Sequence, residues 1–161
     1  SMWKEGEEEE QMSALEIDKN KSVEVFRNKA YAYTQGQLRY VSFLYKVPCK
    51  FTIGTHQIKF ETSQDVESAL KTYRDNLVAR DYKKTTANVE YLQRGEGGRM
   101  HCLVTYKSVD VDEETLSIEY VSYFLELSAE GIVRIAQTEY LDEPKPQLFS
   151  GMDHLLFPVE D

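Results

Sequence analysis

The sequence lacks a long apolar run, has few turn-forming residues and carries no basic leader. Without about 20 consecutive apolar residues it offers no membrane-spanning helix, so a membrane is not expected as a partner. Only 4 prolines and 8 glycines occur among 161 residues and 41% of the chain is hydrophobic, which indicates one globular domain. The acidic start, MWKEGEEEE, has neither the basic region nor the apolar core of a signal peptide.

Cysteine is scarce, and the motifs of several site classes are missing. Cys49 and Cys102 lie far apart and form no CxxC pair, so free thiols in a reducing compartment, the cytoplasm, are expected. No His, Asp or Glu cluster has ligand spacing, and no metal or cofactor is expected. The glycine-rich stretch 95–98 is not followed by GK[ST] and joins two expected strands, which makes it a turn rather than a phosphate loop. There is also no GxSxG nucleophile motif.

Negative charge is concentrated at the two ends of the chain. The net charge is -9, of which residues 1–10 and residues 141–161 each contribute -4, leaving -1 for the body. Because no basic stripe exists, nucleic acid is not expected as a partner. We expect residues 1–17 to be an acidic, disordered N-terminus that begins with an expression-tag remnant. Residues 18–143 are expected to form a single domain.

The tail, residues 144–161, is too apolar for a free segment. We expect it to dock on the domain or on a partner subunit, and this expectation depends on its large apolar side chains: Leu148, Phe149, Met152, Leu155, Leu156 and Phe157.

The stretch LSIEYVSYFLEL, residues 116–127, is apolar on both sides when it is read as a strand. A strand with one solvated face alternates, so both faces of this part of the sheet should be covered. The chain's own helices can cover one face, and a second copy of the protein is the expected cover of the other. The sequence therefore predicts a homodimer.

Helical spacing and turn residues predict the remaining elements. Helices are expected over about 22–35, 38–45 and 62–78, where an apolar stripe and a capping Thr62 or Ser63 define the third. Strands are expected over about 50–53, 57–60, 86–94, 99–107, 116–127 and 132–141. Helices followed by an antiparallel meander indicate an α+β domain with helices on one face of the sheet.

This order and two stretches, LRYVSFLYKVPCKFTIGTHQIKFETSQDVESALKTYRDNL and FLELSAEGIVRIAQTEYLD, resemble the nuclear transport factor 2-like superfamily, also called SnoaL-like. The resemblance covers about residues 22–142 and lies in element order and hydrophobic pattern. It implies a cone: three N-terminal helices packed on a curved antiparallel or mixed sheet, with a pocket inside and, in many members, a dimer through the outer sheet face.

Pairing the strands outward from their turns sorts the sheet residues into two faces. We expect the face that mixes polar and apolar side chains to line the pocket, and the more uniformly apolar face to form the interface. The residues expected to bind a ligand are Tyr31, Tyr45, Leu103, Tyr120, Ser122 and Gln137. The long loop 110–115 leaves the register open, and a slip of one residue would exchange the faces.

Glu139 and His101 are the expected catalytic pair, a base and its partner. In limonene-epoxide-hydrolase-like members an Asp on the last strand acts as the base, and this chain has Glu139 in the matching position. Their Arg and Asp, two residues apart on a neighbouring strand, correspond here to His101 and Leu103, so that hydrolysis is in doubt. Ketosteroid-isomerase-like members place the base on the first strand, where this chain has no carboxylate. The histidines of scytalone-dehydratase-like members are not matched either.

Three functions remain open from the sequence. The first is an enzyme of the cyclase, isomerase or hydratase type that binds a small, largely apolar molecule in the cone pocket. The second is a ligand-binding domain with the same pocket and no catalysis. The third is an association module that recruits a partner protein through the sheet.

Overall fold

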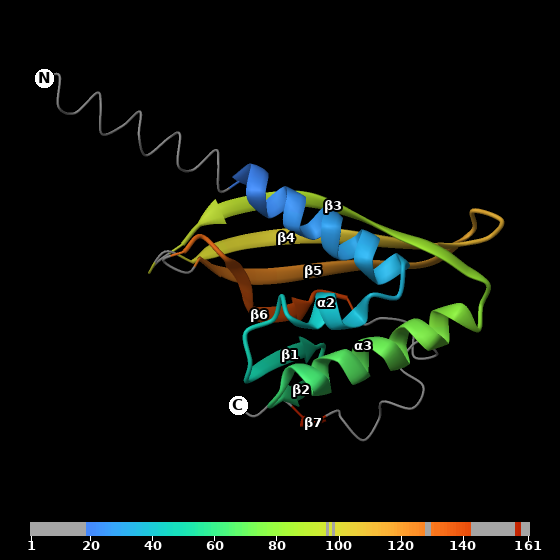
Figure 1. The fold of residues 1–161 in the computed structure, drawn as a ribbon, viewed down its shortest axis with the longest axis horizontal. Coiled ribbons are helices and arrows are strands. Elements are labelled where there is room, and N and C mark those ends of the chain that lie inside the picture. The colour runs from blue at the N-terminus through green and yellow to red at the C-terminus, as the bar shows by residue number, and fades with distance from the viewer. Residues whose placement is uncertain (1–18, 96, 98, 128–129, 143–156, 159–161) are drawn as a thin grey trace, which may run out of the picture.

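Three helices lie on one face of a curved sheet (Figure 1). The computed structural model describes residues 19–95, 97, 99–127, 130–142 and 157–158. The first helix is described over residues 19–34, followed by α2 (Leu38–Ser42) and α3 (Ser63–Val78). The strands are β1 (Cys49–Ile53), β2 (His56–Phe60), β3 (Tyr82–Arg94), β4 (Met100–Asp110), β5 (Thr115–Leu127), β6 (Val133–Tyr140) and β7 (Phe157–Pro158).

The sheet has the strand order β3-β4-β5-β6-β1-β2-β7. β1 runs parallel to β6, and every other neighbouring pair is antiparallel. The predicted fold class, an α+β domain with three helices on a curved mixed sheet, is confirmed. The second helix is shorter than expected, because Tyr45 leaves it to form a bridge with Ile135 of β6.

The predicted chain ends fall largely outside the described residues. The acidic segment 1–17 and most of the tail, 143–156 and 159–161, lie there, so their expected disorder and docking stay predictions. Within the tail, β7 pairs with β2 and forms the edge of the sheet, with Phe157 opposite Gln57. None of the described helices has the length and hydrophobicity that spanning a bilayer requires.

Helix ends are fixed by local hydrogen bonds that the sequence suggests. The side chain of Thr62 accepts a hydrogen bond from the backbone N–H of Asp65 at 3.2 Å, which caps the start of α3. Gly36 follows the first helix with a φ of +76°, which suits glycine, and its N–H donates to the carbonyl of Tyr33 at 3.1 Å.

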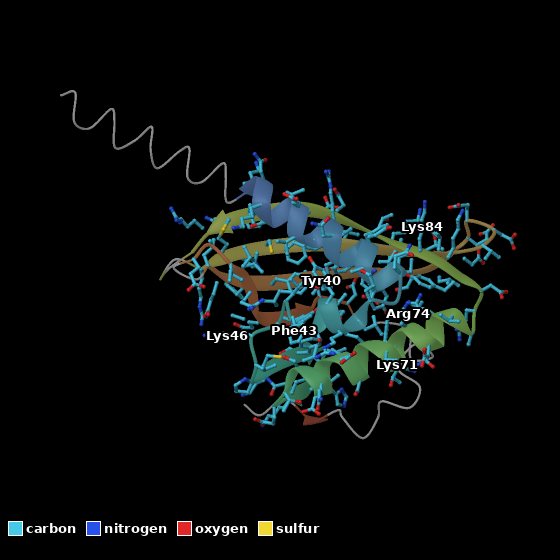
Figure 2. All side chains as sticks on the ribbon, in the orientation of Figure 1. Tyr40, Phe43, Lys46, Lys71, Arg74 and Lys84 are labelled. Atoms are coloured by element: carbon cyan, nitrogen blue, oxygen red, sulfur yellow. The ribbon has the colours of Figure 1, made fainter. Side chains whose placement is uncertain are left out.

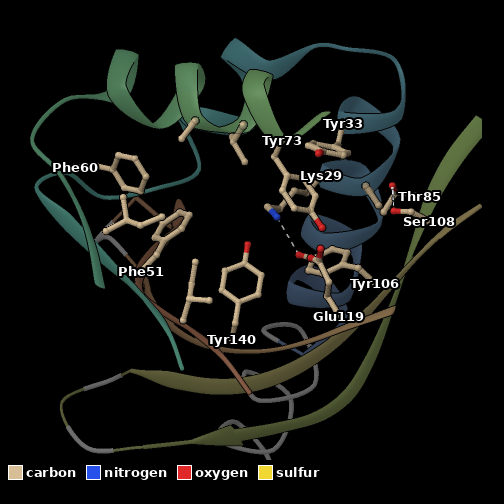
Figure 3. A pocket seen from close by; sticks show the side chains of 15 residues that line it. Lys29, Tyr33, Phe51, Phe60, Tyr73, Thr85, Tyr106, Ser108, Glu119 and Tyr140 are labelled. Atoms are coloured by element: carbon tan, nitrogen blue, oxygen red, sulfur yellow. Dashed lines mark hydrogen bonds between the residues drawn. The ribbon is translucent and has the colours of Figure 1, made fainter. Parts of the chain in front are cut away.

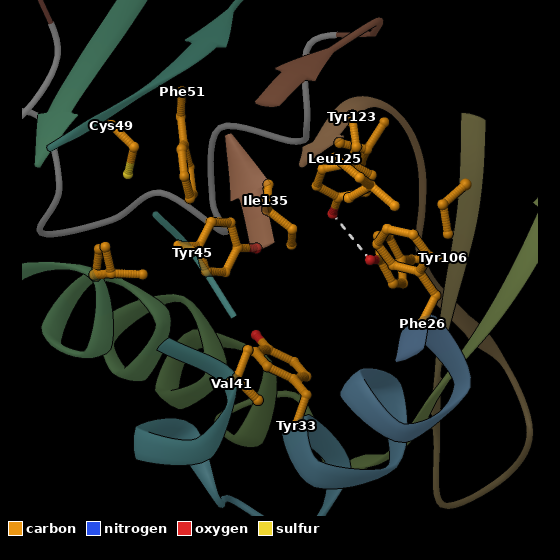
Figure 4. Close-up of a cluster of buried hydrophobic side chains, with 14 of the residues drawn as sticks. Phe26, Tyr33, Val41, Tyr45, Cys49, Phe51, Tyr106, Tyr123, Leu125 and Ile135 are labelled. Atoms are coloured by element: carbon orange, nitrogen blue, oxygen red, sulfur yellow. Dashed lines mark hydrogen bonds between the residues drawn. The ribbon is translucent and has the colours of Figure 1, made fainter. Parts of the chain in front are cut away.

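The sheet has two distinct faces, which we call inner and outer. The inner face turns toward the helices and carries buried side chains from the long strands β4 and β5, among them Cys102, Val104, Tyr106, Val121, Tyr123 and Leu125. Figure 4 shows how these side chains meet those of the helices, including Phe26, whose ring stacks on Tyr123 at 4.9 Å between centroids. The outer face carries the alternate residues of the same strands.

Arg74 ties α3 to the end of the first helix (Figure 2). Its guanidinium donates to the carbonyl oxygens of Tyr33 and Thr34, each at 2.8 Å, and so brings charged donors to the end of the first helix. The same guanidinium lies 5.6 Å from the centre of the Tyr82 ring. This half-buried side chain therefore joins two helices and β3 beside the concave side of the sheet.

An Arg74→Met variant should lose about 2 kcal/mol of unfolding free energy, because it leaves two helix-end carbonyls without charged donors. Lys71→Met on the same helix is the matched control. Lys71 is exposed and pairs with Asp75 four residues on, so its loss should cost about 0.3–0.5 kcal/mol. Urea denaturation followed by circular dichroism measures both, and equal losses would contradict the bridging role of Arg74.

Candidate functional site

A largely apolar cavity lies between the helices and the inner face of the sheet (Figure 3). The cavity has a volume of about 60 Å³. Its walls come from the first helix, α3 and β1 to β6, and most are apolar: Ala30, Phe51, Ile53, Ile58, Phe60, Ala69 and Leu70. The polar groups among these walls determine what the cavity can do.

Lys29 brings a primary amine from the first helix into this cavity. The residue is 7% exposed, and its Nζ donates to the hydroxyl oxygens of Tyr106 at 3.0 Å and Tyr123 at 3.4 Å. Its Nζ also lies 4.6 Å from the centre of the Tyr106 ring. Burial lowers the pKa of Lys29 to about 8, and the negative charge of Glu119 opposes part of that shift.

Glu119 brings a carboxyl group to the same cavity from the middle of β5. Burial raises its pKa to about 7, although the positive charge of Lys29 acts in the opposite direction. The side chain keeps partial exposure because it borders the cavity, yet it is surrounded by protein rather than bulk solvent. One of its oxygens, Oε1, accepts a hydrogen bond from Ser117 at 3.3 Å.

Phenolic hydroxyls surround these two charges. Tyr123 donates to the Tyr106 oxygen at 2.9 Å, and Figure 3 shows the hydroxyl of Tyr140 pointing into the cavity. The Tyr33 hydroxyl is buried and has no hydrogen-bond partner among the described residues, which leaves it available to a ligand. Burial raises the pKa of all four phenols well above the usual value of 10, so at neutral pH they remain protonated donors.

A second polar group lies where β3 and β4 border the cavity. The hydroxyls of Thr85 and Ser108 are 2.7 Å apart, and the Tyr82 hydroxyl lies 2.5 Å from the Thr85 oxygen. Thr34 of the first helix accepts from the Thr85 N–H at 2.9 Å. These groups satisfy one another, so this wall is already hydrogen-bonded without a ligand.

The arrangement has the parts of an acid–base site. A carboxyl group and an amine with pKa values of about 7 and about 8 can both change protonation near neutral pH. Tyr33 can add a hydrogen bond to an oxygen placed in the cavity. Proton transfer to or from a bound molecule is therefore the chemistry that the side chains support.

The structure places most of the predicted site residues on the outer face. His101, Leu103, Tyr120, Ser122, Gln137 and Glu139 lie there, and none of them lines the cavity. The side chains of His101 and Ser122 share a hydrogen bond of 2.7 Å, and the His101 ring stacks on Phe124 at 4.8 Å. Glu139 is exposed and lies opposite Ser122 in the register. Tyr31, on the first helix, is 65% exposed, whereas Tyr45 is buried with its ring centre 5.6 Å from the Lys29 Nζ.

The expectation that the mixed face lines the pocket is therefore wrong, although the strand residues were largely sorted correctly. Thr105 lies opposite Tyr120, and Leu103 lies opposite Ser122, as outward pairing predicts. The greasier face turns inward because it must pack against the helices, and the cavity is a gap within that core. The action of Glu139 and His101 as a catalytic pair stays a prediction, which would now concern the outer face.

Sequence reasoning missed Lys29 and Glu119, although both carry a signal. Lys29 lies three residues after Phe26 and four before Tyr33, so it shares the apolar stripe of its helix. Glu119 shares the apolar strand face of Val121 and Tyr123. Each apolar pattern thus contains one charged residue, and the charges are opposite. From this the sequence could have been used to predict that Lys29 and Glu119 lie close together in the core.

The described residues contain neither a reactive thiol nor a group of metal ligands. Both thiols are buried, and burial raises the pKa of Cys49 to about 11 and that of Cys102 to about 12. Among the residues that the structure describes, no group of three or more His, Cys, Asp or Glu side chains is arranged to hold a metal ion.

Comparison with known proteins identifies the fold through structure alone, since no family model and no curated protein sequence matches the chain. A domain of unknown function with a cystatin-like fold from Nostoc punctiforme is similar, with TM-score 0.64, 12% identity and coverage of 86% of this chain and 85% of that one. An NTF2-like (nuclear transport factor 2-like) protein with a cystatin-like fold from Novosphingobium aromaticivorans gives TM-score 0.59 and 13% identity, covering 81% and 84%.

The chain has the nuclear transport factor 2-like fold. A further structure with this similarity comes from Catenulispora acidiphila, in complex with S-DNPA. Its TM-score is 0.58 at 13% identity, with 80% of this chain and 94% of that chain covered. The structural similarity establishes the fold. Sequence identities this low say nothing about function, which has to be argued from the residues of the cavity.

A Glu119→Gln variant tests the raised pKa of the carboxyl group. The folded chain holds this proton more tightly than the unfolded chain, so ionisation of Glu119 removes stability as the pH rises from about 4.5 to about 7. Glutamine cannot ionise, and the variant should gain up to about 3 kcal/mol relative to the wild type across this window. Urea denaturation at several pH values within the window measures the difference.

Glu139→Gln on the outer face is the control for this measurement. Because Glu139 is exposed and lies outside the cavity, its replacement should change the unfolding free energy by less than about 0.5 kcal/mol. If Glu119→Gln behaved in the same way, the carboxyl group of Glu119 would titrate as an ordinary exposed one.

Proposed function

We propose that the protein binds a small, largely apolar carbonyl compound in the inner cavity and transfers a proton to or from it with Glu119. The observation that carries this proposal is the meeting of a carboxyl group, an amine and phenolic donors in one apolar cavity. Apolar walls would hold the hydrocarbon part of such a ligand, and a few convergent polar groups would fix its orientation.

Glu119 is the proposed general base. A carboxylate whose pKa is about 7 is a stronger base than an ordinary one and is still substantially ionised at neutral pH. Removal of a proton from the carbon beside a carbonyl group leaves negative charge on the carbonyl oxygen. The buried Tyr33 hydroxyl and the Lys29 ammonium are the groups that would stabilise this charge.

The reaction class that fits is an isomerase, cyclase or hydratase acting on a carbonyl compound, since each can include a proton transfer at the carbon beside the carbonyl group. The complex of the Catenulispora acidiphila protein with S-DNPA supports small-molecule binding by a protein of this fold. The limited volume favours compact ligands. A binding protein with the same cavity and no catalysis is the alternative, and it would keep affinity without proton transfer.

Deuterium exchange into a small cyclic ketone separates these two functions. In deuterated water the wild type should speed exchange at the carbons beside the carbonyl group of cyclohexanone, measured by proton NMR. Glu119→Gln should reduce that rate by about 100-fold or more, because it removes the base. Glu90→Gln, at an exposed carboxylate of β3 that does not line the cavity, should leave the rate unchanged, and equal rates in the wild type and Glu119→Gln would contradict the role of Glu119.

A cavity-filling variant tests where the ketone binds. Ala69 lies on α3, is 5% exposed and lines the cavity, so Ala69→Phe should weaken cyclohexanone binding about tenfold or more by occupying its space. Ser68→Phe adds the same ring on the exposed side of the helix and should bind the ketone as the wild type does. Ligand-observed NMR titration gives both affinities, and unchanged binding in Ala69→Phe would place the ketone elsewhere.

The outer face supports a second proposal, association through the sheet. Three large side chains there are well exposed: Tyr91 at 42%, Ile118 at 47% and Tyr120 at 44%. Tyr91 lies opposite Leu103, and Ile118 and Tyr120 lie on the same face of β5, so this row of side chains across the outer face is a surface that a second copy of the chain could cover. The homodimer predicted from the sequence is compatible with this row, and sedimentation of the purified protein would test it.

A further inference from the structure

The Lys29 side chain can interact with a ligand in the cavity in addition to its contacts with the protein. Its Nζ reaches the cavity and donates two hydrogen bonds, to Tyr106 and Tyr123, so one of the three donor positions of an ammonium group remains. The apolar helix stripe that carries Lys29 holds this nitrogen against the cavity wall. Its neighbours are phenols and a carboxyl group, none of which carries a positive charge.

A lysine becomes a nucleophile when it loses its proton, and this cavity favours that loss. Burial brings the pKa of Lys29 from 10.5 to about 8, a difference of 2.5 units. Near neutral pH the neutral fraction is then about 300-fold larger than for an exposed lysine. Glu119 is the group in the same cavity that can accept the proton. Desolvated lysines in apolar pockets are the ones that form imines with carbonyl compounds.

We propose that Lys29 forms a reversible imine with the carbonyl carbon of the small aldehyde or ketone that the cavity binds. This inference rests on the proposed function, because it takes the same ligand in the same cavity. It assigns a covalent role to a residue that the proton-transfer chemistry uses only as a charge. The ligand class thereby narrows to compounds with an unhindered, electrophilic carbonyl group.

The step balances without any oxidant or reductant. The Lys29 lone pair attacks the carbonyl carbon, a carbon–nitrogen bond forms, and the carbonyl oxygen takes up a proton to give a carbinolamine. The carbon–oxygen bond then breaks and water leaves, carrying both protons of the original amine. Glu119 lines the same cavity and is the carboxyl group that would supply and recover these protons, while Tyr106 and Tyr123 hold the nitrogen in place.

Pentane-2,4-dione provides the spectroscopic test. Its imine with an amine rearranges to a conjugated enaminone that absorbs in the near ultraviolet. The wild type should develop this absorbance near neutral pH and saturate at one equivalent per chain. Lys29→Arg keeps the positive charge and donors but cannot form the imine, so it should show none. Lys46→Arg, a change at an exposed lysine paired with Glu126, should behave as the wild type does.

A second measurement uses the wild type alone and does not depend on how a variant folds. Butanone forms the imine and cyanoborohydride reduces it to a stable secondary amine. Peptide mass mapping then locates the alkylated lysine. Alkylation of Lys29 well ahead of every exposed lysine supports the proposal. Slow alkylation spread over exposed lysines, with Lys29 unmodified, overturns it.

The outcome also separates this inference from the proposed function. If the wild type exchanges deuterium into cyclohexanone while no adduct forms on Lys29, the imine is overturned and the role of Glu119 stands. If neither exchange nor adduct is seen, both are overturned. An adduct on Lys29 without exchange supports the imine and removes Glu119 as the base.

Discussion

The structure depends on covering the concave inner face of three long strands. β3, β4 and β5 have 13, 11 and 13 residues, and most of their inner side chains are apolar or aromatic. Burying this surface is the main favourable contribution to folding. The first helix covers the three long strands, and α3 lies toward β1 and β2 (Figure 1). Two straight helices cannot follow a curved sheet along its length, and the cavity lies where they diverge from it.

The charges in this cavity contribute to chemistry more than to stability. Removing an amine and a carboxyl group from water costs several kcal/mol for each ion, and their attraction seldom repays more than that cost. The pKa shifts of Lys29 and Glu119 express this cost, because each group is shifted toward its neutral form. Between pH 7 and 8 the pair therefore destabilises the fold relative to apolar residues of similar size. The Phe26–Tyr123 stack and the surrounding core have to offset that loss.

The fold could be predicted from the sequence to a large extent, because its signals are local. Thr62 marks the start of α3 and Gly36 the end of the first helix. The alternation along residues 116–127 also grouped the residues of each strand face correctly. Which face turns inward was not a local property. It depends on which sheet face packs against the helices, and the more apolar face does so. A separate irregularity in the pairing of β5 with β6, between Phe124 and Leu125, places Ile135 on the inner side.

The candidate site was missed because polarity was read as evidence of a pocket. His101, Ser122 and Glu139 make the outer face mixed, as is usual for a surface in contact with water. Within a core, a functional group appears instead as an exception to an apolar pattern. Lys29 among Phe26 and Tyr33, and Glu119 among Val121 and Tyr123, are such exceptions. Only the tertiary structure shows that these two exceptions border the same cavity, since 90 residues separate them. A buried charge in one element is best interpreted by searching for its complement in the apolar faces of the others.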